Sequence, residues 1–369
     1  LILYLSSRRD VFMRRIYSIL FSVLTIFLLS ACSNSDKNMQ ENENDSDLIS
    51  EDTVETIGSL IKNKDIPYDI IDSHLHYFNF ISETDGFDKL VRKMDESGVS
   101  KSVIFGTPII KSWDQEKRPV YYWDTDSSAY YYSATDFIML EELEKQPKEV
   151  QNRFYPFICG INPHDRNSLD HIKRVIELHP NMVSGIGEIM SKHDDLTAYT
   201  YGEAPRADDK AMLSIYDYAA EQGFPILIHH NIASSYTNEL TYVNEMKNAL
   251  AYNRGVNFIW AHIGISRRVE VDDLIGTAKT LLDENPNLYF DLSWLVYDNY
   301  INISVESLNS WAALIERYPN RFMIGTDLIG KYDNYYDTIS RYGPLVRLLS
   351  RETAEDICSK NILSLVKKY

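Results

Sequence analysis

Five short apolar segments of this chain end in residues that commonly bind metal ions. In each segment a hydrophobic run is followed closely by histidine, glutamate or aspartate, at His74, His76, Glu188, His229, His262 and Asp327. Imidazole nitrogens and carboxylate oxygens together favour Zn²⁺, with Mn²⁺, Fe²⁺ or Co²⁺ as alternatives. Such an ion polarises a carbonyl or phosphoryl oxygen and lowers the pKa of a bound water toward about 7.

The first of these segments carries two histidines, His74 and His76, separated by one residue. Alternate side chains of a β-strand point to the same side, so both imidazoles would face one site. Alone, the pair could equally be two polar residues at the end of a strand. Together with the other strand-end ligands, it predicts half of a divalent-metal site.

The other ligand candidates differ in the roles open to them. We expect Asp327 to bind the metal weakly and to act as general base, although it could instead cap the following segment. His262 could ligate a second metal or stabilise charge on the substrate oxygen without binding metal. His229 is the better candidate of the pair His229-His230. Glu188 could bridge two ions, or bind substrate or serve the structure, so one or two ions remain open.

These residues can meet only if the fold gathers the strand ends. Apolar runs alternate with amphipathic segments eight times, which is typical of a (β/α)8 TIM-like barrel of class α/β, with the metal site at its C-terminal mouth. A doubly wound open sheet is the alternative. Ligands at both the first and the last strand disfavour it, because only closure brings those strands together. Strands are predicted at 68–72, 101–105, 154–161, 182–187, 225–229, 256–262, 287–292 and 321–327, and helices at 87–97, 169–178, 210–222, 239–252, 271–283, 304–318, 335–349 and 352–367.

The connection at 106–132 is long and rich in aromatic residues. Long loops in compact domains are usually functional, and the mouth of a barrel is where its βα-loops lie. We expect this loop to be either a surface insertion that packs on itself or a wall over the site. In the second case Lys111, Trp113 and Tyr122 would contact a small-molecule substrate.

Other residues could add to substrate binding with weaker support. Arg206 could hold a substrate carboxylate or phosphate in a bidentate manner, or it could be a surface charge at a helix start. Trp294, after the seventh predicted strand, could form a pocket wall. His164 and His193 lie in loops that could approach the mouth.

The N-terminal residues predict export. Arg14 and Arg15 precede an apolar run at 16–29, which is too short for a comfortable membrane span. Leu29-Ser30-Ala31-Cys32 resembles the lipobox of bacterial lipoproteins, which implies cleavage before Cys32 and lipidation of its thiol. A plain secretory signal or an uncleaved anchor is the alternative. The predicted location is therefore the cell envelope, either periplasmic or on the outer face, with membrane attachment through Cys32.

The predicted organisation has three parts. Residues 1–31 form the signal peptide, with Met13 as the natural start, and 32–64 form the lipidated cysteine and a disordered acidic tether that is too poor in apolar residues to fold. Residues 65–369 form the barrel. Cys159 and Cys358 are expected to be buried free thiols, although two distant thiols in an exported protein could also pair.

The overall charge excludes one class of partner. The formal net charge of the 369 residues is -17, whereas a nucleic-acid partner would need a basic surface. The composition leaves the oligomeric state open, and homo-oligomers are compatible with it.

The ordered set of motifs resembles a known family. Asp72-Ser73-His74-Leu75-His76, Gly185-Ile186-Gly187-Glu188 and Ile324-Gly325-Thr326-Asp327 are similar to those of the amidohydrolase superfamily, in its amidohydrolase 2 branch of hydrolases, lactonases and non-oxidative decarboxylases. The resemblance covers roughly residues 67–365. It implies a distorted TIM barrel with one or two divalent ions. Many members with two metals carry a carboxylated lysine after the fourth strand, where Glu188 stands here.

Three functions follow as hypotheses. The first is a metal-dependent hydrolase of an amide, ester or lactone, with Asp327 and His262 as catalytic residues. The second is a non-oxidative decarboxylase at the same site, which would need a carboxylate-binding arginine beside the metal. The third is a non-catalytic substrate-binding lipoprotein. The complete set of ligands argues against the third hypothesis.

Overall fold

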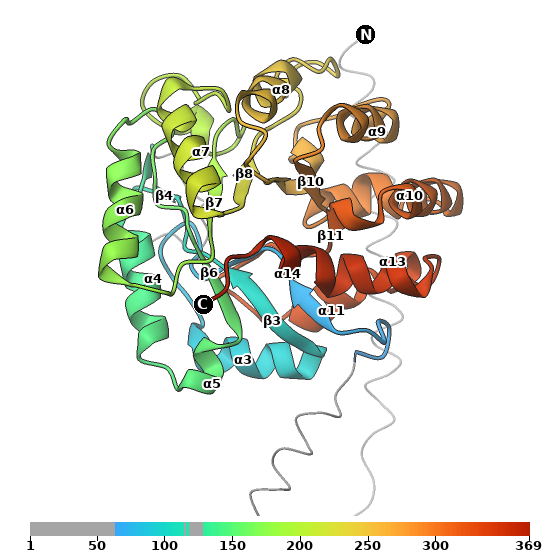
Figure 1. Cartoon of the computed structure of the whole chain (residues 1–369), viewed down its shortest axis with the longest axis horizontal. Helices are drawn as coiled ribbons and strands as arrows, with labels where there is room; N and C mark the ends of the chain where they lie inside the picture. Colours follow the sequence, from blue (N-terminus) through green and yellow to red (C-terminus); the bar gives the residue numbers. More distant parts are fainter. Residues whose placement is uncertain (1–62, 114–115, 118–127) are drawn as a thin grey trace, which may run out of the picture. The chain divides into compact units, whose positions relative to one another are not determined.

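The apolar runs of the sequence form eight parallel strands of one sheet (Figure 1). This computed structural model describes residues 63–113, 116–117 and 128–369. The strands pair in the order β1-β3-β6-β7-β8-β9-β10-β11. Their bounds are β1 (Ile70–Asp72), β3 (Val99–Ile104), β6 (Phe154–Ile158), β7 (Gly185–Met190), β8 (Ile226–His229), β9 (Phe258–Trp260), β10 (Leu288–Asp291) and β11 (Phe322–Met323).

The sheet curls so that its first and last strands meet at their C-terminal ends. The Ser73 N–H donates to the Ile324 carbonyl over 3.1 Å, and the Asp327 N–H donates to the His74 carbonyl over 2.8 Å. Beyond these bonds, β2 (Leu75–His76) pairs in parallel with β12 (Leu328–Ile329). The prediction of a (β/α)8 TIM-like barrel is confirmed, and the open-sheet alternative is not.

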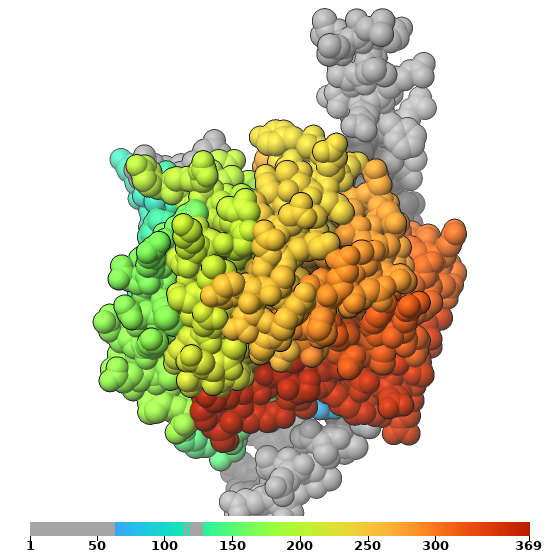
Figure 2. Space-filling model, turned by 45° about the horizontal axis from the view of Figure 1, so that its top comes forward, coloured from blue at the N-terminus to red at the C-terminus, as the bar shows by residue number. Residues whose placement is uncertain are grey.

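Helices lie around the outside of the strands (Figure 1). They are α3 (Gly86–Ser97), α4 (Ala134–Glu144), α5 (Lys148–Gln151), α6 (Ser168–Leu178), α7 (Lys210–Gln222), α8 (Val243–Tyr252), α9 (Leu274–Glu284), α10 (Val305–Arg317), α11 (Tyr335–Ser340), α12 (Gly343–Val346), α13 (Arg351–Glu355) and α14 (Asn361–Leu365). On the surface, successive segments from green through yellow to red lie side by side in sequence order (Figure 2). No helix among the described residues is long and apolar enough to cross a membrane.

Helix α3 shows why these segments take their form. Phe87, Leu90 and Met94 recur at helical spacing and are buried, so one stripe of the helix packs against the sheet. The helix ends at Gly98, which has a φ of 69° and bonds back to the Asp95 and Met94 carbonyls. Glycine adopts this left-handed conformation without a Cβ penalty, so the chain turns directly into β3.

Alternation along the strands separates two apolar layers. In β8, Leu227 belongs to the cluster inside the barrel with Ile71, Val103 and Met323. Ile226 and Ile228, by contrast, belong to the cluster between sheet and helices. Two residues beyond Leu227, His229 therefore lies on the inner side, at the mouth.

The structure differs from the predicted elements in several places, and helices α4 and α5 were not predicted. The predicted helix 335–349 is two helices, α11 and α12, since Pro344 lacks the N–H that a continuous helix needs. The closing helix 352–367 contains a π-helical segment, Asp356–Lys360. The predicted strand 182–187 is β7, which extends to Met190, so Glu188 lies inside a strand rather than after it.

The long connection at 106–132 contains a hairpin. Strands β4 (Ile109–Lys111) and β5 (Ala129–Tyr131) pair antiparallel, while 114–115 and 118–127 lie outside the described residues. The predicted signal peptide, Cys32 and the tether up to residue 62 also lie outside them. Cys159 and Cys358 are buried free thiols, as predicted.

Candidate metal centre

Six predicted ligands converge at the C-terminal mouth of the barrel. His74 precedes β2, His76 lies in β2, Glu188 lies in β7 and His229 ends β8. His262 follows β9, and Asp327 lies between β11 and β12. All six side chains are buried, with at most 7% of the Asp327 side chain exposed.

The backbone is strained where several of these residues sit. His262 and Asp327 have φ values of 55° and 53°, and Trp294 beside them has 57°. Residues other than glycine rarely take such values, which cost of the order of 1–3 kcal/mol and cluster at functional sites. Gly325 lets the backbone before Asp327 pass close to His74, because a Cβ at position 325 would lie only 2.9 Å from His74 Cβ.

Glu188 lies between two pairs of imidazoles. Its Oε2 is 3.3 Å from His76 Nε2 and 3.7 Å from His74 Nε2. Its Oε1 is 3.2 Å from His229 Nδ1 and 3.7 Å from His262 Nε2. Ligand atoms of His74, His76 and Glu188 form one compact group, and those of Glu188, His229 and His262 form another. This arrangement allows one ion or two ions bridged by Glu188.

Asp327, between β11 and β12, faces the same group of imidazoles as Glu188. Its Oδ1 is 3.4 Å from His74 Nε2 and 3.3 Å from His76 Nε2, and its Oδ2 is 3.8 Å from His262 Nε2. Burial by itself raises the pKa of Asp327, but the neighbouring imidazoles of His74, His76 and His262 lower it below its usual value. The carboxylate is therefore ionised and able to accept a proton.

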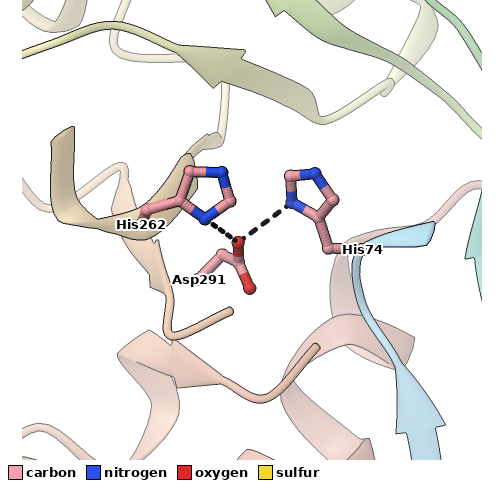
Figure 3. A group of neighbouring side chains, drawn as sticks. All are labelled: His74, His262 and Asp291. Atoms are coloured by element: carbon pink, nitrogen blue, oxygen red, sulfur yellow. Dashed lines mark hydrogen bonds and ion pairs between the residues drawn. The ribbon is translucent and has the colours of Figure 1, made fainter. Parts of the chain in front are cut away.

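Acceptors behind the histidines orient them. Asp291, the last residue of β10, lies between His74 and His262 (Figure 3). Its Oδ2 is 3.0 Å from His74 Nδ1 and accepts the Ser293 hydroxyl over 2.5 Å. Because the hydroxyl proton is used there, Ser293 Oγ accepts from His262 Nδ1 over 2.9 Å. The ring protons thus sit on Nδ1, and the Nε2 lone pairs of both histidines face the centre.

The remaining two imidazoles are oriented in the same sense. His76 Nδ1 lies 3.0 Å from the Gly106 carbonyl, which can only accept, so its Nε2 faces the centre with a lone pair. His229 Nε2 lies 3.2 Å from Asn231 Oδ1, which leaves Nδ1 as the lone pair facing Glu188. Four imidazole lone pairs and two carboxylates therefore converge.

This donor set fits a divalent cation. His74 Nε2 is buried without a hydrogen-bond partner among the described residues, which is costly for a polar atom unless something binds it. Burial lowers the pKa of His74, but the carboxylates of Asp327, Glu188 and Asp291 raise it well above its usual value. The cluster thus attracts positive charge, which either a proton or a metal ion can supply.

We predict that Asp291→Asn weakens metal binding by about 10- to 100-fold, because the variant loses the charge that orients His74 and, through Ser293, His262. A competition titration with a chromophoric chelator measures this affinity. Asp283→Asn is the matched control, since Asp283 is an exposed residue of α9 paired with Lys279. Equal affinities in the two variants would contradict the role of Asp291.

A small pocket opens onto the ligand cluster. Its cavity volume is about 20 Å³, room for an ion or a water molecule rather than a whole substrate. Besides ligands already described, its lining has six residues: Phe80, Met190, Arg267, Trp294, Ile329 and, from the loop after β7, His193. A larger cavity of about 340 Å³ also includes His193, with Lys192, Tyr199 and Arg268 among its other lining residues.

The predicted substrate-binding residues divide into three outcomes. Trp294 lines the pocket. Lys111, in β4, is buried with its Nζ 4.5 Å from the Tyr199 ring centroid, and Trp113 is 42% exposed; neither is among the described lining residues. Tyr122 lies outside the described residues.

Arg206 is not among the residues that line this pocket. The structure does not bring it to the pocket, because its guanidinium bonds Asp208 over 2.7 and 2.9 Å and Glu245 over 3.0 Å. The arginine that lines the pocket is Arg267, which sequence reasoning missed. It follows the ligand His262 by a few residues in the loop after β9, and this position was the available signal.

Sequence reasoning also missed Asp291, which lies next to the end of the predicted strand 287–292 and is the last residue of β10. The family resemblance assigns no ligand to this strand. The segment Asp291-Leu292-Ser293 supplies both the carboxylate that accepts from His74 and the hydroxyl oxygen that accepts from His262.

Comparisons with known proteins agree with this geometry. A model of the amidohydrolase family matches residues 146–367, which are more than half of the chain. The search of curated proteins found no match to this chain.

Solved structures share the fold at low identity. An amidohydrolase from Burkholderia multivorans with bound Zn has a TM-score of 0.52 and 14% identity, over 81% of this chain and 99% of that one. A probable 2-pyrone-4,6-dicarboxylic acid hydrolase from Acinetobacter baumannii with citric acid bound has 0.50 and 12%, over 80% and 98%. A 2,6-dihydroxybenzoate decarboxylase complexed with 2,6-dihydroxybenzoate has 0.50 and 11%, over 81% and 99%. With the family model matched over most of the barrel and this fold shared, the chain belongs to the amidohydrolase family.

Proposed function

We propose that this protein is a metal-dependent hydrolase that cleaves an amide, ester or lactone bond of a small substrate. The observation that carries the proposal is the ionised Asp327 carboxylate beside four imidazole lone pairs and Glu188. His74, His76, Glu188, His229 and His262 would hold the ion or ions, with Asp327 as a weaker ligand. When bound, a divalent ion supplies Lewis-acid polarisation of the substrate oxygen and activates water.

Asp327 supplies the proton transfer. Its Oδ1 and Oδ2 lie between the two histidine groups, where a nucleophilic water would have to sit, so the carboxylate can accept a proton from that water. His262 is better suited to ligation than to donating a hydrogen bond. Its Nδ1 proton is directed to Ser293, so Nε2 has no proton to offer a developing oxyanion.

A non-oxidative decarboxylase is the second candidate. The observation that favours it is Arg267, which lines the pocket and can pair with a carboxylate next to the metal. The 2,6-dihydroxybenzoate decarboxylase that shares the fold is compatible with both a hydrolase and a decarboxylase function for this chain.

One assay separates the candidates. The purified, metal-loaded protein is offered a panel of esters, lactones, amides, phosphoesters and aromatic carboxylic acids, with product analysis and CO₂ detection. Bond hydrolysis without CO₂ supports the hydrolase, and CO₂ release supports the decarboxylase. Tight ligand binding without turnover on any member of the panel would favour a substrate-binding protein and overturn the proposal.

We also propose that the protein is an exported lipoprotein of the cell envelope, attached through Cys32. Support comes from the sequence Leu29-Ser30-Ala31-Cys32 after a short apolar run. We predict that cells expressing the protein incorporate labelled palmitate into it and that it sediments with membranes. Cys32→Ala should abolish both, while Cys358→Ala, at a buried free thiol, should change neither. Labelling that persists in Cys32→Ala would contradict the assignment.

A further inference from the structure

One buried carboxylate ties together three loops at the mouth of the barrel. The side chain of Asp194, in the loop after β7, is only 7% exposed. Its Oδ1 accepts from Asn231 Nδ2 over 2.9 Å and from the Ser266 hydroxyl over 2.5 Å. Asn231 and Ser266 are buried too, and they lie in the loops that follow the ligands His229 and His262. The carboxylate is thus joined to the segments that carry two ligands, although it lies outside the ligand cluster itself.

The charge of Asp194 determines which way the side-chain amide of Asn231 points. Burial by itself raises the pKa of Asp194, but the hydrogen bonds from Ser266 and Asn231 help to lower it below its usual value. An ionised carboxylate can only accept hydrogen bonds, so the group of Asn231 that faces it must be the N–H₂. The amide oxygen of Asn231 is thereby directed the other way, toward His229.

That amide oxygen in turn determines which nitrogen of His229 carries the ring proton. Asn231 Oδ1 lies 3.2 Å from His229 Nε2, and an amide oxygen can only accept. The proton of His229 therefore sits on Nε2. The lone pair is left on Nδ1, which faces Glu188 Oε1 at 3.2 Å inside the centre. The two hydrogen bonds in series thus connect the charge of Asp194 to the metal-binding nitrogen of His229.

The other contacts of the His229 ring do not select this arrangement. The His193 ring stacks on it, with centroids 4.5 Å apart and an interplanar angle of 28°. Stacking holds the plane of the ring, but a half-turn about the Cβ–Cγ bond leaves that plane unchanged while it exchanges nitrogen and carbon positions. Glu188 is a carboxylate and would by itself favour a proton on Nδ1, which would block metal binding there. The hydrogen bond from His229 to Asn231 therefore opposes the tautomer that Glu188 alone would favour.

We propose that Asp194 and Asn231 form a positioning relay that holds His229 in its metal-binding tautomer. The inference rests on the proposed function only in taking the ligand cluster to bind divalent ions. Neither residue of the relay touches the ion or the substrate, and both act through His229. Loss of a hydrogen-bond partner behind a ligand histidine typically lowers metal affinity by about 10- to 100-fold. The effect should be confined to the side of the centre formed by Glu188, His229 and His262.

Zinc affinity in matched variants tests the relay without requiring turnover. It is measured on the full chain by competition with a chromophoric chelator. Asn231→Leu keeps the approximate shape of the side chain but removes both of its hydrogen-bonding groups, and should weaken Zn²⁺ binding by about 10-fold or more. Ser266→Ala removes the other donor to the same oxygen of Asp194 and leaves both bonds of the relay, so it should bind Zn²⁺ as wild type does. Equal affinities in the two variants would overturn the relay, because the carboxylate would then only anchor the loops.

Exchanging the two residues of the relay provides the rescue. In the double variant Asp194→Asn, Asn231→Asp, the carboxylate at position 231 accepts from His229 Nε2 and from the amide at position 194, so each hydrogen bond of the relay is made again. Zinc affinity should therefore return close to the wild-type value. A folded double variant that binds Zn²⁺ as weakly as Asn231→Leu would contradict the proposal, and thermal unfolding of each variant verifies that it is folded.

A spectroscopic measurement on wild type covers the case in which the variants do not fold. In the ¹¹³Cd²⁺-loaded, ¹⁵N-histidine-labelled protein, cadmium–nitrogen coupling identifies the ring nitrogen that binds the ion. We expect coupling to Nδ1 of His229 and a proton on its Nε2, and coupling to Nε2 of His229 would overturn the relay.

Turnover tests the proposed function separately from the relay. Weakened Zn²⁺ binding in Asn231→Leu and its recovery in the double variant would support the relay even if the protein hydrolysed no member of the substrate panel. Hydrolysis by wild type together with unchanged Zn²⁺ affinity in Asn231→Leu would overturn the relay alone.

Discussion

Replacing Asp327 by asparagine is expected to lower turnover by about two to four orders of magnitude, the range that general acid–base catalysis contributes. The neighbouring imidazoles lower the pKa of Asp327, so the group is a carboxylate at neutral pH. An asparagine of the same shape cannot accept a proton. The measurement is kcat on the best substrate of the panel.

The metal content decides what the loss in Asp327→Asn means. His74, His76, Glu188, His229 and His262 remain in the variant, so we expect it to retain its ions. A slow variant with full metal content identifies Asp327 as the proton acceptor. Wild-type turnover in Asp327→Asn would contradict the mechanism, whereas loss of both metal and turnover would make Asp327 an essential ligand instead.

Removing the metal is expected to abolish turnover altogether and to lower the midpoint of thermal unfolding. Without an ion, Glu188, Asp291 and Asp327 bring three carboxylates into one buried cluster. An ion that binds only the folded state stabilises it by roughly 2.7 kcal/mol at a free concentration of 100 Kd. Dialysis against a chelator, followed by activity assay and calorimetry with and without added Zn²⁺, measures both effects.

Recovery on adding the metal is the control for this experiment. Turnover and the unfolding midpoint should return together in wild type. In a double variant His74→Ala, His76→Ala, neither should return at the same Zn²⁺ concentration, because one side of the centre is missing. Full activity in chelator-treated protein that contains no metal would exclude a metal-dependent reaction.

The fold could be predicted because its determinants are local. The barrel strands are largely buried on both faces and appear in the sequence as short apolar runs, and long outer helices such as α3 show the 3.6-residue period. Ligands such as His229 follow from the same periodicity, since a residue two positions beyond the inward Leu227 must face the mouth. Convergence of the six ligands required only that the barrel close.

What could not be predicted depends on contacts between distant segments. The sequence alone does not distinguish Arg206 from Arg267. In the folded chain, Arg206 bonds Asp208 and Glu245, whereas Arg267 lines the pocket. The tautomer of His193 depends on a single backbone N–H, that of Asp195. Glu188 lies inside β7 because pairing with β8 continues to Met190, beyond the end of the apolar run.

The central claim is that the strand-end histidines and carboxylates hold catalytic divalent ions. The most direct measurement is anomalous X-ray diffraction from crystals of the Zn²⁺-loaded protein, recorded on both sides of the zinc edge. We expect one anomalous peak within about 2.0–2.2 Å of His74 Nε2, His76 Nε2 and Glu188, and a second peak beside His229 and His262 if the protein holds two ions. Fully loaded crystals without an anomalous peak between these side chains would contradict the account.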